Sequence, residues 1–205
     1  ESACVIYSCA MRITGGRFGG LQVSAPDRRM RPTRDMVREA LFSILGEQIT
    51  GGKFADLFAG SGIVGMEAAS RGADEVWWIE KAGRSCSVLK RVSQKFPDFA
   101  GRIIRADVCR ALGGVLRGER FDIVFADPPY LEPGPADGEA CGAAGWREYL
   151  LRKIPAFDVI ADGGLFIFES EKRDIVGEET RQHEGWKTID IRTYGGTGLC
   201  FYLRG

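Results

Sequence analysis

The residues with the most specific chemistry are Asp127, Pro128, Pro129 and Tyr130, which directly follow the apolar run of residues 121–126. Prolines lack N–H groups and have a fixed φ, so the pair stiffens the turn and directs carbonyl oxygens into a cleft. The Asp127 carboxylate and the Pro128 carbonyl can then accept both protons of an exocyclic amine and push its nitrogen toward tetrahedral geometry. Tyr130 offers a flat face for stacking a planar substrate. The pattern predicts a site for a weakly nucleophilic nitrogen; the alternative is a Pro-Pro turn that only ends a strand.

A second candidate is the glycine-rich turn of residues 56–62 (DLFAGSG), placed between an apolar strand and a helix. Small residues let the backbone approach a ligand, and the start of the following helix offers free N–H groups. Such a turn also fits a dinucleotide or phosphate site, or a tight turn with no ligand.

Two carboxylates stand at further strand ends. Glu80 ends the apolar segment of residues 76–80, where a carboxylate can accept both hydroxyls of a ribose; the alternative is a surface ion pair with Lys81. Asp107 follows the short strand expected at residues 103–106. It can accept a proton of an adenine amine, or it can cap the next helix.

The elements that position these residues alternate between strand and helix. We expect a β-hairpin within residues 12–25 and a helix capped by Thr33 or Asp35. Strands are expected near residues 54–58, 76–80, 103–106, 121–126, 165–169, 187–194 and 199–203, with helices after 62 and near 84–96, 108–116 and 146–157. Repeated βα units predict an α/β fold with a doubly wound, seven-stranded, mostly parallel sheet, and the final hairpin predicts an antiparallel edge. Ligands of such sheets bind at the carboxyl ends of the strands.

Composition limits the possible partners. The 205 residues have no net charge, but residues 12–38 contain seven arginines and only two acids, residues 81–120 are also basic, and the C-terminal part is acidic. This asymmetry is typical of an anion-binding face, although solvated arginines are the alternative. Six scattered cysteines without a Cys-x-x-Cys pair, and the single His183, argue against a metal site and favour reduced thiols in a cytoplasmic protein. No apolar run is long enough to span a membrane.

The chain resembles the bacterial 16S rRNA guanine-N2 methyltransferases of the RsmD type. The resemblance covers residues 11–205 and rests on segments spread along the chain. They are Arg12-Ile13 with Gly15-Gly16 and Gly19, residues 31–42 beginning Arg31-Pro32-Thr33, the glycine-rich turn, Ser70-Arg71-Gly72-Ala73, Asp127 to Tyr130, and Tyr194-Gly195. The order of glycine-rich turn, Glu80, Asp107 and Asp-Pro-Pro-Tyr is that of a class I S-adenosylmethionine methyltransferase acting on nitrogen.

The resemblance implies a Rossmann-like methyltransferase domain, S-adenosylmethionine as cofactor, and 16S rRNA or the small ribosomal subunit as partner of a monomer. It implies that Asp127, Pro128, Pro129 and Tyr130 hold the target base. The cofactor residues it implies are Asp56, Phe58, Gly60, Ser61, Gly62, Glu80, Asp107 and Val108, with Arg31 and Thr33 at the entrance. For the RNA phosphates we expect Arg12, Arg17, Arg28, Arg29, Arg34 and Arg38.

The expected organisation is an extension at residues 1–10 from start-site choice or cloning, because Met11 looks like a natural start and residues 1–10 do not form a signal peptide. An RNA-facing hairpin and helix follow at residues 11–50, and the methyltransferase domain at residues 51–205. Residues 131–145 are rich in glycine and alanine and longer than the family's usual passage. They are a substrate-ordered lid or a tolerated insertion.

Three other functions fit parts of the pattern. A DNA adenine-N6 methyltransferase uses Asp-Pro-Pro-Tyr but usually needs further target-reading segments, for which this chain has little room. A glutamine-N5 methyltransferase usually has Asn at the position of Asp127. The third is a non-catalytic RNA-binding or ribosome-assembly protein on the same fold, against which the intact set of carboxylates argues.

Overall fold

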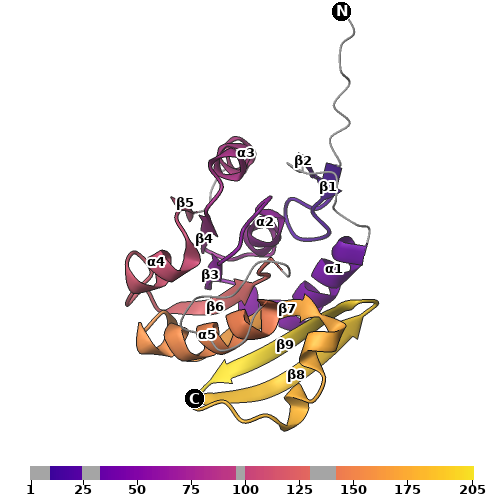
Figure 1. Ribbon diagram of the computed structural model, residues 1–205. Coiled ribbons are helices and arrows are strands. Elements are labelled where there is room, and N and C mark those ends of the chain that lie inside the picture. Colours follow the sequence, from indigo (N-terminus) through magenta and orange to yellow (C-terminus); the bar gives the residue numbers. More distant parts are fainter. Residues whose placement is uncertain (1–9, 25–32, 96–99, 130–141) are drawn as a thin grey trace, which may run out of the picture.

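The computed structural model describes residues 10–24, 33–95, 100–129 and 142–205. The strands are β1 (Ala10–Arg12), β2 (Gln22–Ser24), β3 (Lys53–Asp56), β4 (Glu75–Glu80), β5 (Ala100–Arg105), β6 (Phe121–Ala126), β7 (Ile160–Glu171), β8 (Trp186–Tyr194) and β9 (Thr197–Arg204). The α-helices are α1 (Thr33–Leu45), α2 (Ile63–Ser70), α3 (Gly83–Ser93), α4 (Val108–Gly113) and α5 (Gly142–Ala156), and short 3-10 turns are η1 (Gly46–Ile49), η2 (Lys172–Ile175) and η3 (Glu178–Thr180). The expected alternation of strands and helices is confirmed (Figure 1).

Seven strands form one sheet in the order β5-β4-β3-β6-β7-β9-β8. The pairs from β5 to β7 are parallel, and β9 runs antiparallel to both of its neighbours. From β3 the chain moves outward to β4 and β5, and then returns to β6 on the other side of β3, so the strand order reverses between β3 and β6. Ligands of doubly wound sheets bind at the carboxyl ends of the strands beside this reversal. The predicted mostly parallel, seven-stranded fold is confirmed.

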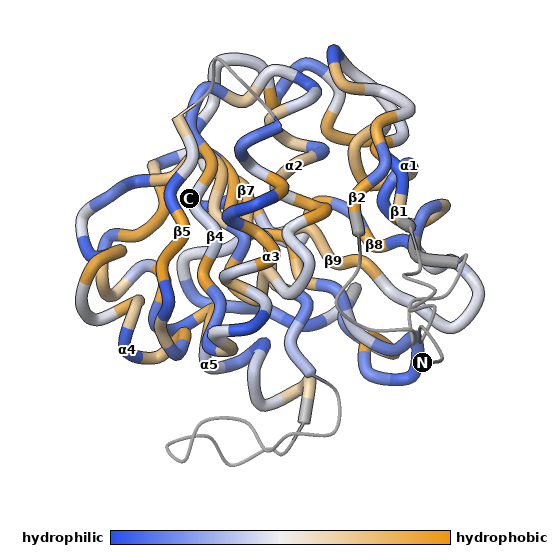
Figure 2. The backbone as a smooth tube through the Cα atoms, turned by 90° about the horizontal axis from the view of Figure 1, so that it is seen from above, coloured by the Kyte–Doolittle hydropathy of each residue, from blue (hydrophilic) through white to orange (hydrophobic). Residues whose placement is uncertain are grey.

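Helices cover both faces of the sheet. Buried residues of α1, α2 and α3 form one core together with the N-terminal hairpin, and those of α4 and α5 form the second core. Trp77 and Trp78, adjacent on β4, are fully buried in opposite cores, as expected for core residues rather than a base-stacking site. Figure 2 shows the apolar colour along the central strands β4 and β7. None of the helices in the described part of the chain has the length and apolar character to cross a bilayer.

The hairpin β1–β2 is held against α2 by a buried carboxylate that the sequence did not reveal. Glu67 has no exposed surface, and its Oε atoms accept hydrogen bonds from the backbone N–H of Thr14 (2.8 Å) and Gly15 (2.9 Å) and from the Thr14 hydroxyl (2.7 Å). The guanidinium groups of Arg38 and Arg71 complete its surroundings at 3.3 and 2.8 Å. This cluster fixes the direction of the hairpin along α2.

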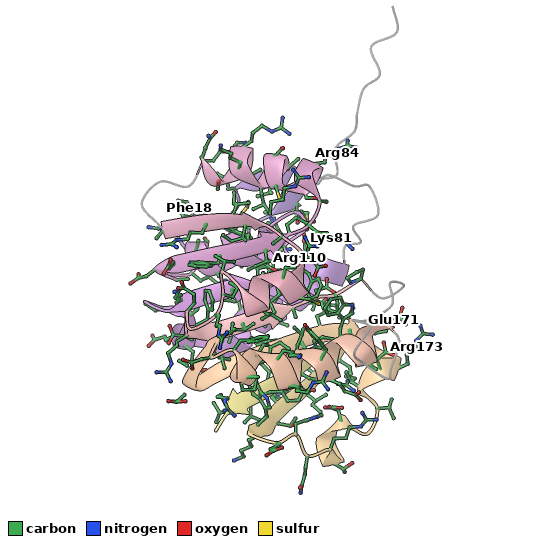
Figure 3. The ribbon with its side chains drawn as sticks, turned by 60° about the vertical axis from the view of Figure 1, so that its left-hand side comes forward. Phe18, Lys81, Arg84, Arg110, Glu171 and Arg173 are labelled. Atoms are coloured by element: carbon green, nitrogen blue, oxygen red, sulfur yellow. The ribbon has the colours of Figure 1, made fainter. Side chains whose placement is uncertain are left out.

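That direction places the tip of the hairpin away from the carboxyl ends of the strands. The backbone N–H of Arg17 donates to the carbonyl of Ser70 (2.8 Å), and that of Phe18 donates to the Ser70 hydroxyl (2.9 Å). Ser70 ends α2, a helix that starts at the carboxyl end of β3 and runs back toward the amino ends. In Figure 3, Phe18 accordingly lies at the opposite side from Lys81, Glu171 and Arg173.

The largest difference from the expected elements is the start of β7, at Ile160 instead of residue 165. Gly163 and Gly164 look like a break in the sequence, but Gly163 (φ +73°) continues the strand through an irregularity. The β6–β7 pairing shifts register between Phe121 and Ile123 at this place. A bulge thus takes up the extra residues without ending the strand.

Candidate active site

A cleft of about 340 Å³ opens at the carboxyl ends of β3, β4, β5 and β6. Three predicted carboxylates, Glu80, Asp107 and Asp127, line it, together with Pro128 and Pro129. Its apolar walls are Leu57, Phe58, Ile79, Val108 and Trp146. The fold therefore brings four separate segments of the sequence to one place, as expected from the reversal of strand order. Tyr130 lies outside the described residues.

The glycine-rich turn has a backbone that only glycine adopts easily. Gly60 and Gly62 have φ values of +53° and +78°, in the left-handed region where a Cβ is strained. A Cβ on Gly62 would also lie 2.4 Å from Leu89 Cδ2, so glycine is required there for packing as well as for conformation. The turn is tied to the neighbouring strand because Ala59 N–H donates to the Ile79 carbonyl (3.0 Å).

Glu80 is bound to the same turn. Its Oε2 accepts a hydrogen bond from Gly60 N–H (2.8 Å), and its Oε1 accepts one from Ala82 N–H (2.6 Å). These two amides fix the carboxylate at the cleft wall. The glycine-rich turn and the predicted ribose acceptor thus form one unit, although they are twenty residues apart in the sequence.

Asp107 caps a helix and also lines the cleft, so the two interpretations that the sequence left open are compatible. Its Oδ1 accepts a hydrogen bond from Cys109 N–H (2.9 Å) and so caps α4. The residue is exposed and also lines the cleft. A cap occupies one carboxylate oxygen and holds the side chain in place, so capping does not prevent Asp107 from accepting a ligand proton.

Asp56 is the most perturbed acid of the site. It ends β3, where it pairs with Trp78 on β4 and with Phe125 on β6, so Glu80 and Asp127 stand two residues beyond its partners. It is 1% exposed, and burial raises its pKa to about 7, assisted by the negative charges of Asp127 and Glu80 and opposed by hydrogen bonds from the Gly65 and Phe58 backbone. Its Oδ2 has no hydrogen-bond partner in the described part of the structure.

These features fit a cationic ligand with an apolar body. A buried acceptor without a partner costs free energy, which a donor on a ligand would recover. Phe58 and Trp146 meet edge to face, with ring centroids 5.0 Å apart, and give the cleft a flat aromatic wall. The Trp146 indole N–H is likewise buried without a partner among the described residues. Trp146 and Leu57 were missed by the sequence analysis, because apolar residues beside a turn look like core residues.

The structure separates several other predicted residues from the cleft. Ser61 is buried, its hydroxyl 3.9 Å from the sulfur of Met11, so its side chain turns toward the hairpin. Arg38 is 3% exposed and bound to Glu67, Asp35 and the Arg12 carbonyl. This burial contradicts its predicted contact with RNA phosphates, because its charge is already neutralised inside the protein. Arg17 lies at the hairpin tip, at the far edge of the sheet, and Arg12 is exposed on β1.

Besides Tyr130, five predicted residues lie wholly or partly outside the described part of the structure. Arg28, Arg29 and Arg31 fall outside the described residues. Thr33 and Arg34 begin α1, but only their backbone is described.

Comparisons with known proteins agree with this geometry. The family described as "Conserved hypothetical protein 95" matches residues 11–203. The ribosomal RNA small subunit methyltransferase D of Escherichia coli K12 is 35% identical over 162 residues, which cover 78% of this chain and 75% of that protein. The solved Escherichia coli structure of yhhF, assigned as a methyltransferase, is 26% identical with a TM-score of 0.74 and covers 95% of this chain and 98% of that one.

A more distant solved structure has the same fold. The Thermus thermophilus 16S rRNA N2 G1207 methyltransferase, solved in complex with S-adenosylmethionine and guanosine, is 20% identical with a TM-score of 0.63 and covers 97% of this chain and 50% of that one. At this identity the likeness shows the fold alone. From the family match and the 35% identical relative, the chain belongs to the RsmD-type methyltransferase family.

Proposed function

We propose that this protein transfers a methyl group from S-adenosylmethionine to the exocyclic N2 of a guanine in small-subunit rRNA, in the cytoplasm where ribosomes are made. The observation that carries the proposal is that Asp127 and Pro128 line the same cleft as Glu80 and Asp107. Acceptors for an amine and acceptors for a nucleoside thus face one space. Membership of the family and the name of its 35% identical relative support rRNA as the substrate.

Each part of the cleft has a proposed partner in the cofactor. Glu80 accepts the ribose hydroxyls, and Asp107 accepts from the adenine amine. Phe58 and Val108 contact the adenine ring, with Trp146 added from the structure. The turn at Gly60 and Gly62, together with Asp56, faces the methionine part. When bound, S-adenosylmethionine supplies an electrophilic methyl group on a sulfonium cation, and carboxylates near a cation stabilise its charge.

The remaining catalytic work is positioning and proton transfer by the chain itself. The Asp127 carboxylate and the Pro128 carbonyl accept hydrogen bonds from the two N–H groups of the guanine amine. These two hydrogen bonds localise the lone pair of the amine and orient it. The amine becomes acidic once the lone pair is committed, and Asp127 or water takes the proton. The target base must leave its stack to reach the cleft, so an unpaired nucleotide costs least. Arg12 is a proposed phosphate contact, and Tyr130 a proposed stacking partner.

Labelled methyl transfer to small-subunit particles, naked rRNA and DNA, followed by nucleoside analysis, tests the proposal. We expect label in N2-methylguanine of the rRNA. Two variants that each remove one negative charge are compared. Asp127→Asn removes an acid that lines the cleft, and Asp162→Asn removes one outside the cleft whose side chain is 82% exposed. Label only in N6-methyladenine of DNA, or only in protein, would contradict the proposal.

A further inference from the structure

Four exposed cations lie beside the cleft and have no part in the proposed chemistry. Lys81 follows β4 and lines the cleft, Arg84 is in the first turn of α3, Arg105 ends β5, and Arg110 is in α4. We name these four residues the basic rim. Figure 3 shows Lys81 and Arg84 on the side of the molecule away from Phe18, with Arg84 at α3 and the Arg110 label next to that of Lys81.

The basic rim differs from the opposite edge of the sheet in how its charges are balanced. At the amino ends of the strands, Lys53 pairs with Glu75 and Glu119, and Arg120 pairs with Asp158 and Asp162. Within the described residues, Arg84, Arg105 and Arg110 have no carboxylate within 4.0 Å. Three unneutralised arginines therefore lie together at the edge that holds the site.

The local arrangement concentrates this positive charge. Arg105 lies directly over the start of α3, because a Cβ on Gly83 would be 2.9 Å from its Cζ, and Arg84 is the next residue. The first turn of α3 contains no acid, and its N-cap, Ala82, provides no side-chain hydrogen bond. A cation at a helix N-terminus is unfavourable because the helix dipole is positive at that end. Residues 81–95 also contain Lys90, Arg91 and Lys95 and no Asp or Glu.

On the other side of the cleft, Arg173, after β7, pairs with Glu171 at 2.7 Å, so its charge is offset. Among the described residues, Arg84, Arg105 and Arg110 thus form a group of unpaired arginines over α3, β5 and α4. Several exposed arginines at one edge match a polymer with regularly spaced negative charges.

We propose that the basic rim binds backbone phosphates of the RNA strand that flanks the target nucleotide. This inference rests on the proposed function, and it moves the RNA-binding surface away from the hairpin tip. The arginines hold the strand so that one unpaired base reaches Asp127, and they contribute affinity but no sequence preference. The rim was visible in the sequence as a basic segment, yet only the fold places its charges around the site.

A triple variant, Arg84→Gln/Arg105→Gln/Arg110→Gln, tests the proposal in the full chain. Lys81 is left intact because it lines the cofactor cleft. The matched control, Arg117→Gln/Lys187→Gln/Arg192→Gln, removes the same charge from exposed positions away from the rim. Affinity for transcribed small-subunit rRNA is measured without cofactor at several salt concentrations, and S-adenosylmethionine affinity is measured separately by calorimetry.

For the rim variant we expect RNA affinity to fall roughly 10- to 100-fold near 0.15 M salt, and the slope of log K against log salt to flatten by about 2, since each single-strand phosphate contact contributes about 0.7. The cofactor affinity of the rim variant and the RNA affinity of the control variant should stay within about twofold of wild type. Salt screens exposed charges that are distant from the bound ligand. An unchanged slope in the rim variant, or an equal loss in the control, overturns the inference. If wild type binds RNA through the rim but transfers no methyl group, only the proposed function fails.

Discussion

At the scale of single residues, two aspartates near the same strand ends have different surroundings. Asp127 is half-buried and lines the cleft, where our proposal places the substrate amine. Asp56 is buried behind it with a pKa raised to about 7. Burial thus keeps a proton on Asp56 at pH values where a carboxyl group in water is ionised.

Replacing Asp127 should therefore remove catalysis and spare binding. We expect Asp127→Ala to lower the single-turnover rate of methyl transfer roughly 10²- to 10⁴-fold, the range for a positioned proton acceptor. S-adenosylmethionine affinity, measured by calorimetry, should change little, because Glu80 and Asp107 hold most of the cofactor in our proposal. Near-wild-type turnover in this variant would show that Asp127 does not hold the amine.

Asp56 should make stability depend on pH in an unusual direction. Its folded pKa, about 7, lies above the ordinary value of 3.8, so the folded state retains a proton that the unfolded state loses. Its stabilising contribution is thus complete below about pH 4 and is lost as pH rises toward 7, by up to about 1.4 kcal/mol per pH unit.

Urea unfolding of wild type and Asp56→Asn between pH 5 and 8 measures this contribution. Other acids affect both proteins alike, so the difference between the two curves isolates Asp56. We expect wild type to lose stability relative to the variant as pH rises to 7, with no further change above pH 8. Parallel curves over the whole range would mean that Asp56 is ionised at all these pH values.

At the scale of elements, the least foreseen feature is the attachment of the hairpin to α2 through Glu67. Removing its charge leaves the guanidinium of Arg38 buried without one of its two carboxylate partners, and breaking a buried pair costs about 3–5 kcal/mol. We expect Glu67→Gln to lower the free energy of unfolding by about 3 kcal/mol and to speed amide exchange at Thr14 and Gly15. Exchange at β3 and β6 serves as the internal control, since it follows global unfolding alone.

A matched variant sharpens that measurement. The single variant Arg38→Met and the double variant Glu67→Gln/Arg38→Met complete a double-mutant cycle. A loss of unfolding free energy in the double variant that is smaller than the sum of the two single losses indicates direct coupling. Additive losses, or unchanged exchange at the hairpin amides, would show that Glu67 does not hold the hairpin.

The same element shows where prediction from sequence ends. Strand ends were predictable because apolar runs followed by Glu80, Asp107 or Asp127 have few other interpretations in a βα pattern. Glu67 was not, because one acid in a helix normally faces solvent, and only the docked hairpin buries it. Arg38 was misassigned for the same reason, since a sequence does not show which arginine meets a buried acid. The start of β7 was missed because, in the sequence, the bulge at Gly163 looks like the end of a strand.

At the scale of the whole molecule, the hairpin and α1 share one core with the sheet. Ile13, Val23 and Leu41 are buried in the cluster that also contains Phe54 and Trp78. From the sequence we proposed an extension at residues 11–50 and a methyltransferase domain at residues 51–205. Because the two segments share one core, they follow each other along the chain but are not separate folding units. Domains that fold alone have cores of their own.

This shared core predicts a single unfolding transition for the full chain. Tryptophan fluorescence reports on Trp77, Trp78, Trp146 and Trp186, and far-UV circular dichroism reports on all helices. The two urea curves should coincide. The fragment of residues 51–205 should lack a cooperative transition, because removing residues 11–50 exposes the apolar surface of α2 and of β3 that α1 and the hairpin cover. Each large side chain so exposed costs about 1.5–3 kcal/mol, and a few of them equal the 5–15 kcal/mol that stabilises a domain of this size. A fragment that unfolds cooperatively near the wild-type midpoint would instead establish residues 51–205 as an independent domain, with the hairpin as a later addition to a complete fold.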